Sequence, residues 1–230
     1  MKITYFGQSA FQIKTGKTTI LIDPFLTGNK HTKVDPFDLN PEYILLTHAH
    51  QDHTGDSFDI ARRTGATIIT QTDYAQYIND ILPEAKGCHA EGINFGGTFS
   101  ADDFSVKLYP AWHTDARMVG NALVPVGVAA GMALTIEDKL IYDTGDTALF
   151  SDLKLVARKH PVDLALICIG GHFTMDADDA LVAADFLQAK HVIPTHYNTF
   201  PAIQADPQKF VEQLPTDVGI IPDFDKEFDF

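Results

Sequence analysis

Alternation of apolar and polar residues predicts β-structure at the start of the chain. Three short runs rich in β-forming residues are separated by turns that contain glycine, and they span 2–6, 9–14 and 18–22. Runs spaced this closely predict an antiparallel meander. The next segment, 23–41, carries prolines at positions 24, 36 and 41, and it therefore predicts a long loop.

Beyond residue 41, apolar runs of strand length alternate with segments of helical period. The runs at 42–47 and 66–70 predict buried strands. Each is followed by a predicted helix, the first from about Gly55 to Arg63 and the second over 73–82. This part of the chain is therefore expected to form strand–helix units.

The second half repeats this order. β-structure is predicted over 93–142, and alternation of helices and strands follows it. The predicted strands are "VDLALICIG" and "HVIPT", and the predicted helices are about 149–159, 176–189 and 206–214. Because each half runs from meander strands into strand–helix units, we predict an α/β protein. It would be one domain over 1–230, built from two α/β halves packed sheet against sheet with helices outside.

The charge of the chain narrows the range of partners. It has 17 basic and 31 acidic residues and a formal net charge of −14, whereas binding to nucleic acid needs a basic patch. We therefore expect neither a nucleic-acid partner nor an anionic membrane surface. Cys88 and Cys168 are far apart and form no CxxC pair, so reduced thiols are expected. The N-terminus lacks the apolar region of a signal peptide and no apolar run has membrane-spanning length, which predicts a cytoplasmic location.

The segment "THAHQDHT" at 47–54 is the strongest chemical signal in the chain. It places His48, His50, Asp52 and His53 within six positions, directly after a predicted buried strand. His48 and His50 are two residues apart, a spacing that points side chains the same way along extended chain. Imidazole and carboxylate are ligands of Zn, Fe, Ni and Mn. A solvated loop with histidines by chance is the alternative, and this concentration favours a metal site over it.

Further ligands are expected at other strand ends, because one metal ion needs about four ligands. His113, Asp146 and His196 each follow a predicted strand. Taken alone, His113 has the alternative of a surface or core histidine, Asp146 of a helix cap and His196 of a turn residue. Asp143 competes with Asp146 for the ligand role. Their shared place at strand ends favours one composite site.

The order of these residues resembles that of the metallo-β-lactamase superfamily of binuclear metallohydrolases. The shared pattern is HxHxDH, a lone histidine, an aspartate in a GDT turn and a late histidine, and it covers nearly the whole chain. The segments "DPFLTGN", "GDTALFSD", "IGGHFTM" and "IPTHYNTFP" are similar to those of short prokaryotic metal-dependent hydrolases related to the ascorbate-6-phosphate lactonases. The resemblance implies an αβ/βα sandwich of two packed mixed β-sheets with helices on the outer faces and the site at one edge.

The resemblance also implies the ligands of two divalent metal ions. The first ion would be bound by His48, His50 and His113, the second by Asp52, His53 and His196, and Asp146 would bridge them. Zinc is the commonest metal of the family, and manganese, nickel or iron are alternatives. Two cations that share a water lower its pKa to about 7 and so supply hydroxide at neutral pH.

Other residues near these motifs are candidates for catalysis or substrate contact. The resemblance implies that Asp52 also accepts a proton from the attacking water. His172 follows a buried strand and two glycines, and it would either orient a ligand carboxylate or act as a proton donor or substrate contact. Asn198 and Phe200 directly follow a ligand and are expected in the pocket wall. The weakest candidates, for contact with an anionic substrate, are Arg117, Asn29 and His31.

Two classes of function fit this set. The first is a metal-dependent hydrolase that uses a metal-activated hydroxide on a small ester, lactone or phosphodiester. The alternative is a non-hydrolytic metal-binding member of the same fold, either a sensor or an iron-dependent oxidoreductase. The chain carries no flavodoxin-like or rubredoxin-like partner domain, which argues against oxygen reduction. The expected partner is a small-molecule substrate, and self-association into a homo-oligomer is left open.

Overall fold

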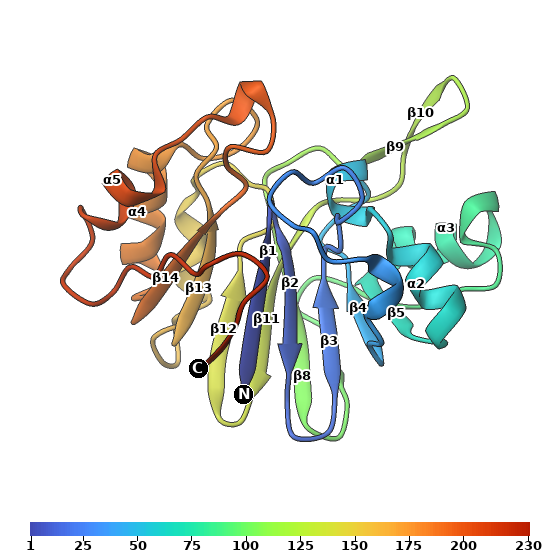
Figure 1. Ribbon diagram of the computed structural model, residues 1–230, viewed down its shortest axis with the longest axis horizontal. Coiled ribbons are helices and arrows are strands. Elements are labelled where there is room, and N and C mark those ends of the chain that lie inside the picture. The colour runs from blue at the N-terminus through green and yellow to red at the C-terminus, as the bar shows by residue number, and fades with distance from the viewer.

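Two β-sheets pack face to face in the middle of the molecule, and helices cover the outer face of each (Figure 1). The computed structural model describes all residues, 1–230. Helices α2 (Ser57–Thr64) and α3 (Thr72–Asp80) lie on one side, and α4 (Ala177–Phe186) and α5 (Pro207–Val211) lie on the other. The predicted αβ/βα sandwich is confirmed.

The first sheet has seven strands in the order β15-β1-β2-β3-β4-β5-β6. Their bounds are Lys2–Gly7 (β1), Ala10–Lys14 (β2), Thr19–Ile22 (β3), Tyr43–Leu45 (β4), Thr67–Gln71 (β5), His89–Ile93 (β6) and Glu227–Asp229 (β15). Strands β1 to β3 pair antiparallel, which confirms the predicted meander, and β3 to β6 pair in parallel. Strands β6 and β15 were not predicted, because "HAEGI" is polar and β15 is only three residues long.

The second sheet has six strands in the order β14-β13-β12-β11-β8-β7. Their bounds are Thr98–Ser100 (β7), Phe104–Pro110 (β8), Ala130–Ile136 (β11), Lys139–Asp143 (β12), Leu164–Cys168 (β13) and His191–Thr195 (β14). Antiparallel pairing again gives way to parallel pairing, between β12 and β14. A separate hairpin of β9 (Ala116–Val119) and β10 (Ala122–Pro125) projects from the body of the molecule (Figure 1).

An apolar layer fills the space between the two sheets. The first sheet contributes Ile22 and Leu45 to it, and the second contributes Leu108, Leu134 and Ile193. Two further apolar clusters lie beneath the helices, one under α2 and α3 and one under α4. Burial of apolar surface, at roughly 25 cal/mol per Å², holds the layers together and fixes how the strand ends of one sheet meet those of the other.

The pairing of the second sheet places several strand ends at one edge. Strands β8 and β12 both pair antiparallel with β11, and β12, β13 and β14 are parallel to one another. Strands β8, β12 and β14 therefore run in the same direction, and their carboxyl ends meet at the same edge. Helix α1 (Gln51–Thr54), which follows β4 of the first sheet, lies at this edge as well (Figure 1).

The predicted helix at 149–159 is wrong. The chain stays extended through Phe150, and only the 3-10 turn η3 (Ser151–Leu155) follows, with bonds such as Leu153 N–H to the Phe150 carbonyl. The backbone before a proline is biased away from helix, and Pro161 stands close behind this segment. The proline limits how far a helix could continue, and only the 3-10 turn η3 forms before it.

The helix predicted from about Gly55 to Arg63 is divided in two. Helix α1 ends at Thr54, and α2 begins at Ser57. Gly55 separates them because it has a positive φ of 42°, and a Cβ there would overlap the backbone of Phe25. The break frees α1 to lie at the sheet edge with Asp52 and His53.

The remaining elements are short. Three further 3-10 turns are η1 (Pro36–Asp38), η2 (Pro83–Ala85) and η4 (Pro201–Ile203). The first lies within the segment that was predicted as a loop. Both cysteines are free, as expected. None of the helices reaches the length and apolar character that crossing a bilayer would require.

Candidate metal centre

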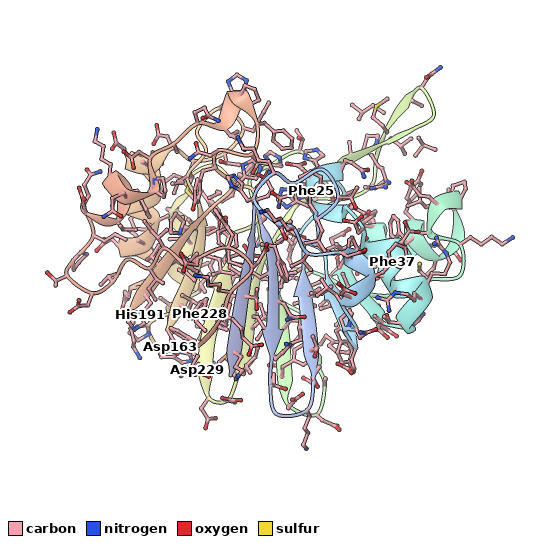
Figure 2. All side chains as sticks on the ribbon, in the orientation of Figure 1. Phe25, Phe37, Asp163, His191, Phe228 and Asp229 are labelled. Carbon is pink, nitrogen blue, oxygen red and sulfur yellow. The ribbon has the colours of Figure 1, made fainter.

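The residues predicted as metal ligands converge on one edge of the sandwich. From the first sheet, the chain leaves β4 and brings in His48 and His50, and α1 then carries Asp52 and His53. From the second sheet, the ligands follow the three strands that end at this edge: His113 after β8, Asp146 after β12 and His196 after β14. His191, at the start of β14, lies at the other end of that strand, away from this edge of the sandwich (Figure 2).

The first group of ligands consists of three histidines. The Nδ1 atom of His50 lies 3.0 Å from Nε2 of His48 and 3.3 Å from Nε2 of His113. One ligand atom from each residue lies within 4.8 Å of the others. Burial lowers the pKa of all three rings, and that of His48 falls well below its ordinary value. Neutral imidazole is the form that binds a metal ion.

The second group consists of Asp52, His53 and His196. The Oδ2 atom of Asp52 lies 3.8 Å from Nε2 of His53 and 3.5 Å from Nε2 of His196. His53 and His196 are buried, whereas Asp52 remains partly accessible. One ligand atom from each of these three residues lies within 4.8 Å of the others.

Asp146 lies between the two groups. Its Oδ2 atom is 3.0 Å from Nε2 of His196, 3.3 Å from Nε2 of His53 and 3.6 Å from Nε2 of His113. One carboxylate oxygen thus approaches histidines of both groups, as a bridging ligand would. Asp143 contacts neither group. Its Oδ1 accepts a hydrogen bond from Gly145 N–H, and burial and the charge of Asp23 raise its pKa to about 7.

The pKa values of His196 and Asp146 show how strongly the charged side chains of the site interact. Burial alone would lower the pKa of His196, but the Asp146 carboxylate outweighs burial and raises it to about 9. Burial is likewise outweighed at Asp146, where the charges of His196 and His53 hold the pKa well below its usual range.

The buried polar atoms fit a metal ion. His53 Nε2 and Asp146 Oδ1 are buried without a hydrogen-bond partner, and a buried unpaired polar atom costs about 1–3 kcal/mol. Imidazole nitrogens and carboxylate oxygens are also the donors that zinc and related cations take. The donor set and the unpaired atoms are therefore those of a site for divalent cations.

Two ligands are held by residues that the sequence analysis missed. Asp23 Oδ2 lies 2.7 Å from Nδ1 of His53, and this carboxylate also accepts hydrogen bonds from Thr47 N–H and Oγ1–H. Gln8 donates from Nε2 to Oδ2 of Asp52 over 2.8 Å. Asp23 could have been found from its place directly after the predicted strand 18–22. Gln8 lies in a turn between two strands and gives no sequence signal.

The peptide of Ala49, between ligands His48 and His50, is held at both of its polar groups. Asp115 Oδ1 accepts a hydrogen bond from Ala49 N–H over 2.8 Å, and Arg117 Nη1 donates to the Ala49 carbonyl over 3.3 Å. Both residues follow His113 closely in the chain. The segment that supplies one ligand of the first group thus also positions the backbone that carries the other two.

The prediction that Arg117 meets the substrate is wrong. Its side chain is buried, forms an ion pair with Glu84 and lies over the ring of Phe58, 5.2 Å from the centroid. Asn29 and His31 do not reach the site either. Asn29 donates to backbone carbonyls of the loop and of β1, and His31 stacks on Phe224.

His172 is exposed and makes no hydrogen bond to a ligand. Its ring contacts Phe173 edge to face, with centroids 4.5 Å apart. The structure therefore does not bring His172 to the ligands as an orienting residue. A role in proton donation or substrate contact stays a prediction.

A close approach of backbone fixes the position of His196. This residue has a positive φ of 54°, a conformation that costs a non-glycine residue on the order of 1–3 kcal/mol. Its N–H donates to the Gln8 carbonyl. A Cβ on Gly170 would overlap the His196 carbonyl oxygen and lie 3.3 Å from the ring nitrogen Nδ1. Only glycine at position 170 leaves room for this strained backbone.

A cavity of about 620 Å³ opens over the ligands. Its lining residues are Phe25, His50, Gln51, Asp52, His113, Thr114, Asp146, Phe173, His196 and Phe200. The prediction that Phe200 forms part of the pocket wall is confirmed. Asn198 is not among the lining residues, and its Oδ1 accepts a hydrogen bond from Ala205 N–H.

Comparison with known proteins defines the class. The family model described as the beta-lactamase superfamily domain matches residues 18–197, and the chain belongs to this superfamily of metallo-β-lactamase folds. A relative from Oenococcus oeni is 99% identical over 230 residues and covers 100% of both chains. A second, from Ligilactobacillus salivarius, is 50% identical over 229 residues with the same coverage. Both are UPF0173 metal-dependent hydrolases, and the chain is a metal-dependent hydrolase of that family whose substrate is unassigned.

Solved structures agree with this assignment. Igni18, a metallo hydrolase from the archaeon Ignicoccus hospitalis, is 32% identical with a TM-score of 0.87, and the match covers 100% of this chain and 98% of Igni18. An isothiocyanate hydrolase from Delia radicum gut bacteria has a TM-score of 0.76 at 17% identity, with 100% and 99% of the two chains covered. At that identity the second likeness shows a shared fold alone.

Replacing Gly170 by alanine should displace His196. We expect Gly170→Ala to weaken binding at the second group by about ten- to a hundred-fold, the range for residues that hold a metal ligand in place. Gly16→Ala is the control, because a Cβ there meets no atom within 4 Å. Metal affinity would be measured by competition with a chelator. Equal affinities of the two variants would contradict the argument from close approach.

Removing the Asp115 carboxylate should loosen the first group. Without a partner for Ala49 N–H, His48 and His50 are held less precisely, so Asp115→Ala should lower affinity at the first group about tenfold. The exposed Asp102→Ala is the matched control. Chelator competition again provides the measurement. A fall at the second group and none at the first would show that Asp115 does not act through Ala49.

Proposed function

We propose that this hydrolase acts on a small ester, lactone or phosphodiester with two divalent metal ions bound at the candidate centre. The observation that carries the proposal is the shared carboxylate, since Asp146 Oδ2 lies within 3.6 Å of ring nitrogens from both groups of ligands. The first ion would be held by His48, His50 and His113, and the second by Asp52, His53 and His196, with Asp146 common to both. Zinc is the proposed metal, and manganese, nickel or iron would fit the same donors.

The residues of the site have different roles in the proposed hydrolysis. When bound, two such ions supply a hydroxide nucleophile at neutral pH and polarise the scissile bond. Asp52 is partly accessible from the cavity, and the hydrogen bond from Gln8 fixes one of its oxygens. In that position Asp52 can take up a proton from the attacking water. Asp23 holds His53 through Nδ1 and leaves Nε2 facing Asp146.

The proposal extends to partners. A net charge of −14 repels polyanions at long range, and salt screens this repulsion over roughly 8 Å under physiological conditions. A cavity of about 620 Å³ suits a small molecule. We therefore propose a small-molecule substrate and no nucleic-acid or membrane partner. The cytoplasmic location expected from the sequence is a further part of the proposal. The kinship with ascorbate-6-phosphate lactonases and self-association into a homo-oligomer also remain parts of this proposal.

Metal analysis of purified protein tests the centre directly. We expect about two divalent ions per chain, because seven donors exceed what one ion takes. His48→Ala or His113→Ala should empty the first position, and His53→Ala or His196→Ala should empty the second. The exposed His160→Ala serves as control. A wild-type protein that binds no more than one ion per chain would rule out a binuclear centre.

The two buried aspartates give a matched comparison. Asp146→Asn keeps the side-chain volume and removes a charge that both groups share, so it should lower both metal affinity and turnover. Asp143→Asn removes a carboxyl group that contacts neither group, and the loss should be at least tenfold smaller. Metal content and hydrolysis rates of the two variants provide the readout. A larger loss from Asp143→Asn would mean that the bridging aspartate has been misassigned.

A further inference from the structure

We propose that the part of the substrate beyond the scissile bond is apolar and uncharged, and that Phe25, Phe173 and Phe200 select it. This inference rests on the proposed function and narrows the substrate class at the same cavity. It is carried by two features of the cavity wall, the placement of three aromatic rings and the lack of lysine and arginine side chains.

The three rings come from separate loops and enclose the space over the ligands. Phe25 follows β3 and Asp23, Phe173 follows β13, and Phe200 follows β14 and His196. Phe25 lies at the edge of the sandwich where the ligands gather (Figure 2). The rings of Phe25 and Phe200 are tilted against each other with centroids 6.1 Å apart. Rings held by both sheets form a wall whose shape is largely set before a substrate arrives.

Phe173 is the most exposed of the three rings. Its side chain is 56% exposed, although it lines a cavity. An exposed phenylalanine at the rim gains free energy when an apolar group covers it, and a charged or strongly hydrated group provides no such gain. The residue thus favours substrates with an apolar group that reaches from the scissile bond to the rim.

The charges of the residues that line the cavity support the same inference. No lysine or arginine lines the cavity, and the polar residues apart from the candidate ligands are Gln51 and Thr114. Arg117 is the buried arginine next to the site, and it is engaged by Glu84 and the Ala49 carbonyl. A second negative charge beside these rings would therefore have no lysine or arginine as a partner, and it would lose contacts with water without compensation. The lining offers no lysine or arginine to the phosphate of a phosphorylated lactone, the kind of substrate that the lactonase resemblance would suggest.

The test compares substrates that differ only in the remote group. Three pairs cover the bond types of the proposed function. They are p-nitrophenyl pentanoate and p-nitrophenyl hemiglutarate, an alkyl-substituted δ-lactone and its ω-carboxyalkyl analogue, and phenyl p-nitrophenyl phosphate and its carboxyphenyl analogue. Each is assayed with protein carrying the same measured metal content. We expect the apolar member of the hydrolysed pair to have a kcat/KM at least about tenfold higher, because a pocket of this kind discriminates by about that factor per apolar group.

Two variants connect the preference to the wall. Phe173→Lys places a cation at the rim, and it should reduce or reverse the preference by raising kcat/KM on the anionic member. Phe37→Lys is the control. Phe37 is also exposed, at 64%, but it lies in the 3-10 turn η1, away from the cavity (Figure 2). Its preference should equal that of the wild-type protein.

The outcomes separate this inference from the proposed function. Hydrolysis of none of the six compounds by metal-loaded protein would count against the proposed function itself. Hydrolysis in which the anionic member is turned over as fast as the apolar one would overturn only the inference about the remote group. An unchanged preference in Phe173→Lys would also overturn it, because the wall would then not be what selects.

Discussion

The candidate site depends on the contact between the two sheets. Each sheet alone carries only part of the donor set, since His48, His50, Asp52 and His53 come from the first and the remaining ligands from the second. The apolar layer between the sheets fixes the position of one sheet edge relative to the other. Asp146 Oδ2 therefore lies 3.3 Å from Nε2 of His53, which belongs to the opposite sheet. Packing far from the cavity thus sets distances that coordination would require to within tenths of an ångström.

Much of this arrangement could be predicted from the sequence, for identifiable reasons. The two α/β halves and their packing follow from the order of meander strands and strand–helix units, which each half repeats. The residues that converge at the candidate centre could be found because the motif at 47–54 concentrates imidazoles, and because His113, Asp146 and His196 each follow a strand. These features are local in the chain, and a single sequence displays them.

The features that could not be predicted depend on contacts between distant segments. Asp115 and Arg117 position the Ala49 peptide, and nothing in the sequence near Ala49 indicates it. Gln8 reaches Asp52 across 44 positions of the chain. The error at 149–159 is of another kind, because Phe150 is extended and only the 3-10 turn η3 follows it. Arg117 was expected to contact the substrate because it lies in a predicted loop. Its partners Glu84 and Phe58 instead hold it in the interior.

The spread of ligands along the chain has a consequence for biosynthesis. The residues of the first group have all been synthesised by position 113, but the second group is incomplete until His196 has been added and β14 joins its sheet. His113 can meet His48 and His50 only after β8 has been joined by later strands and the second sheet has packed on the first. The donor set therefore closes late in synthesis, and metal uptake would follow folding of the chain rather than guide it.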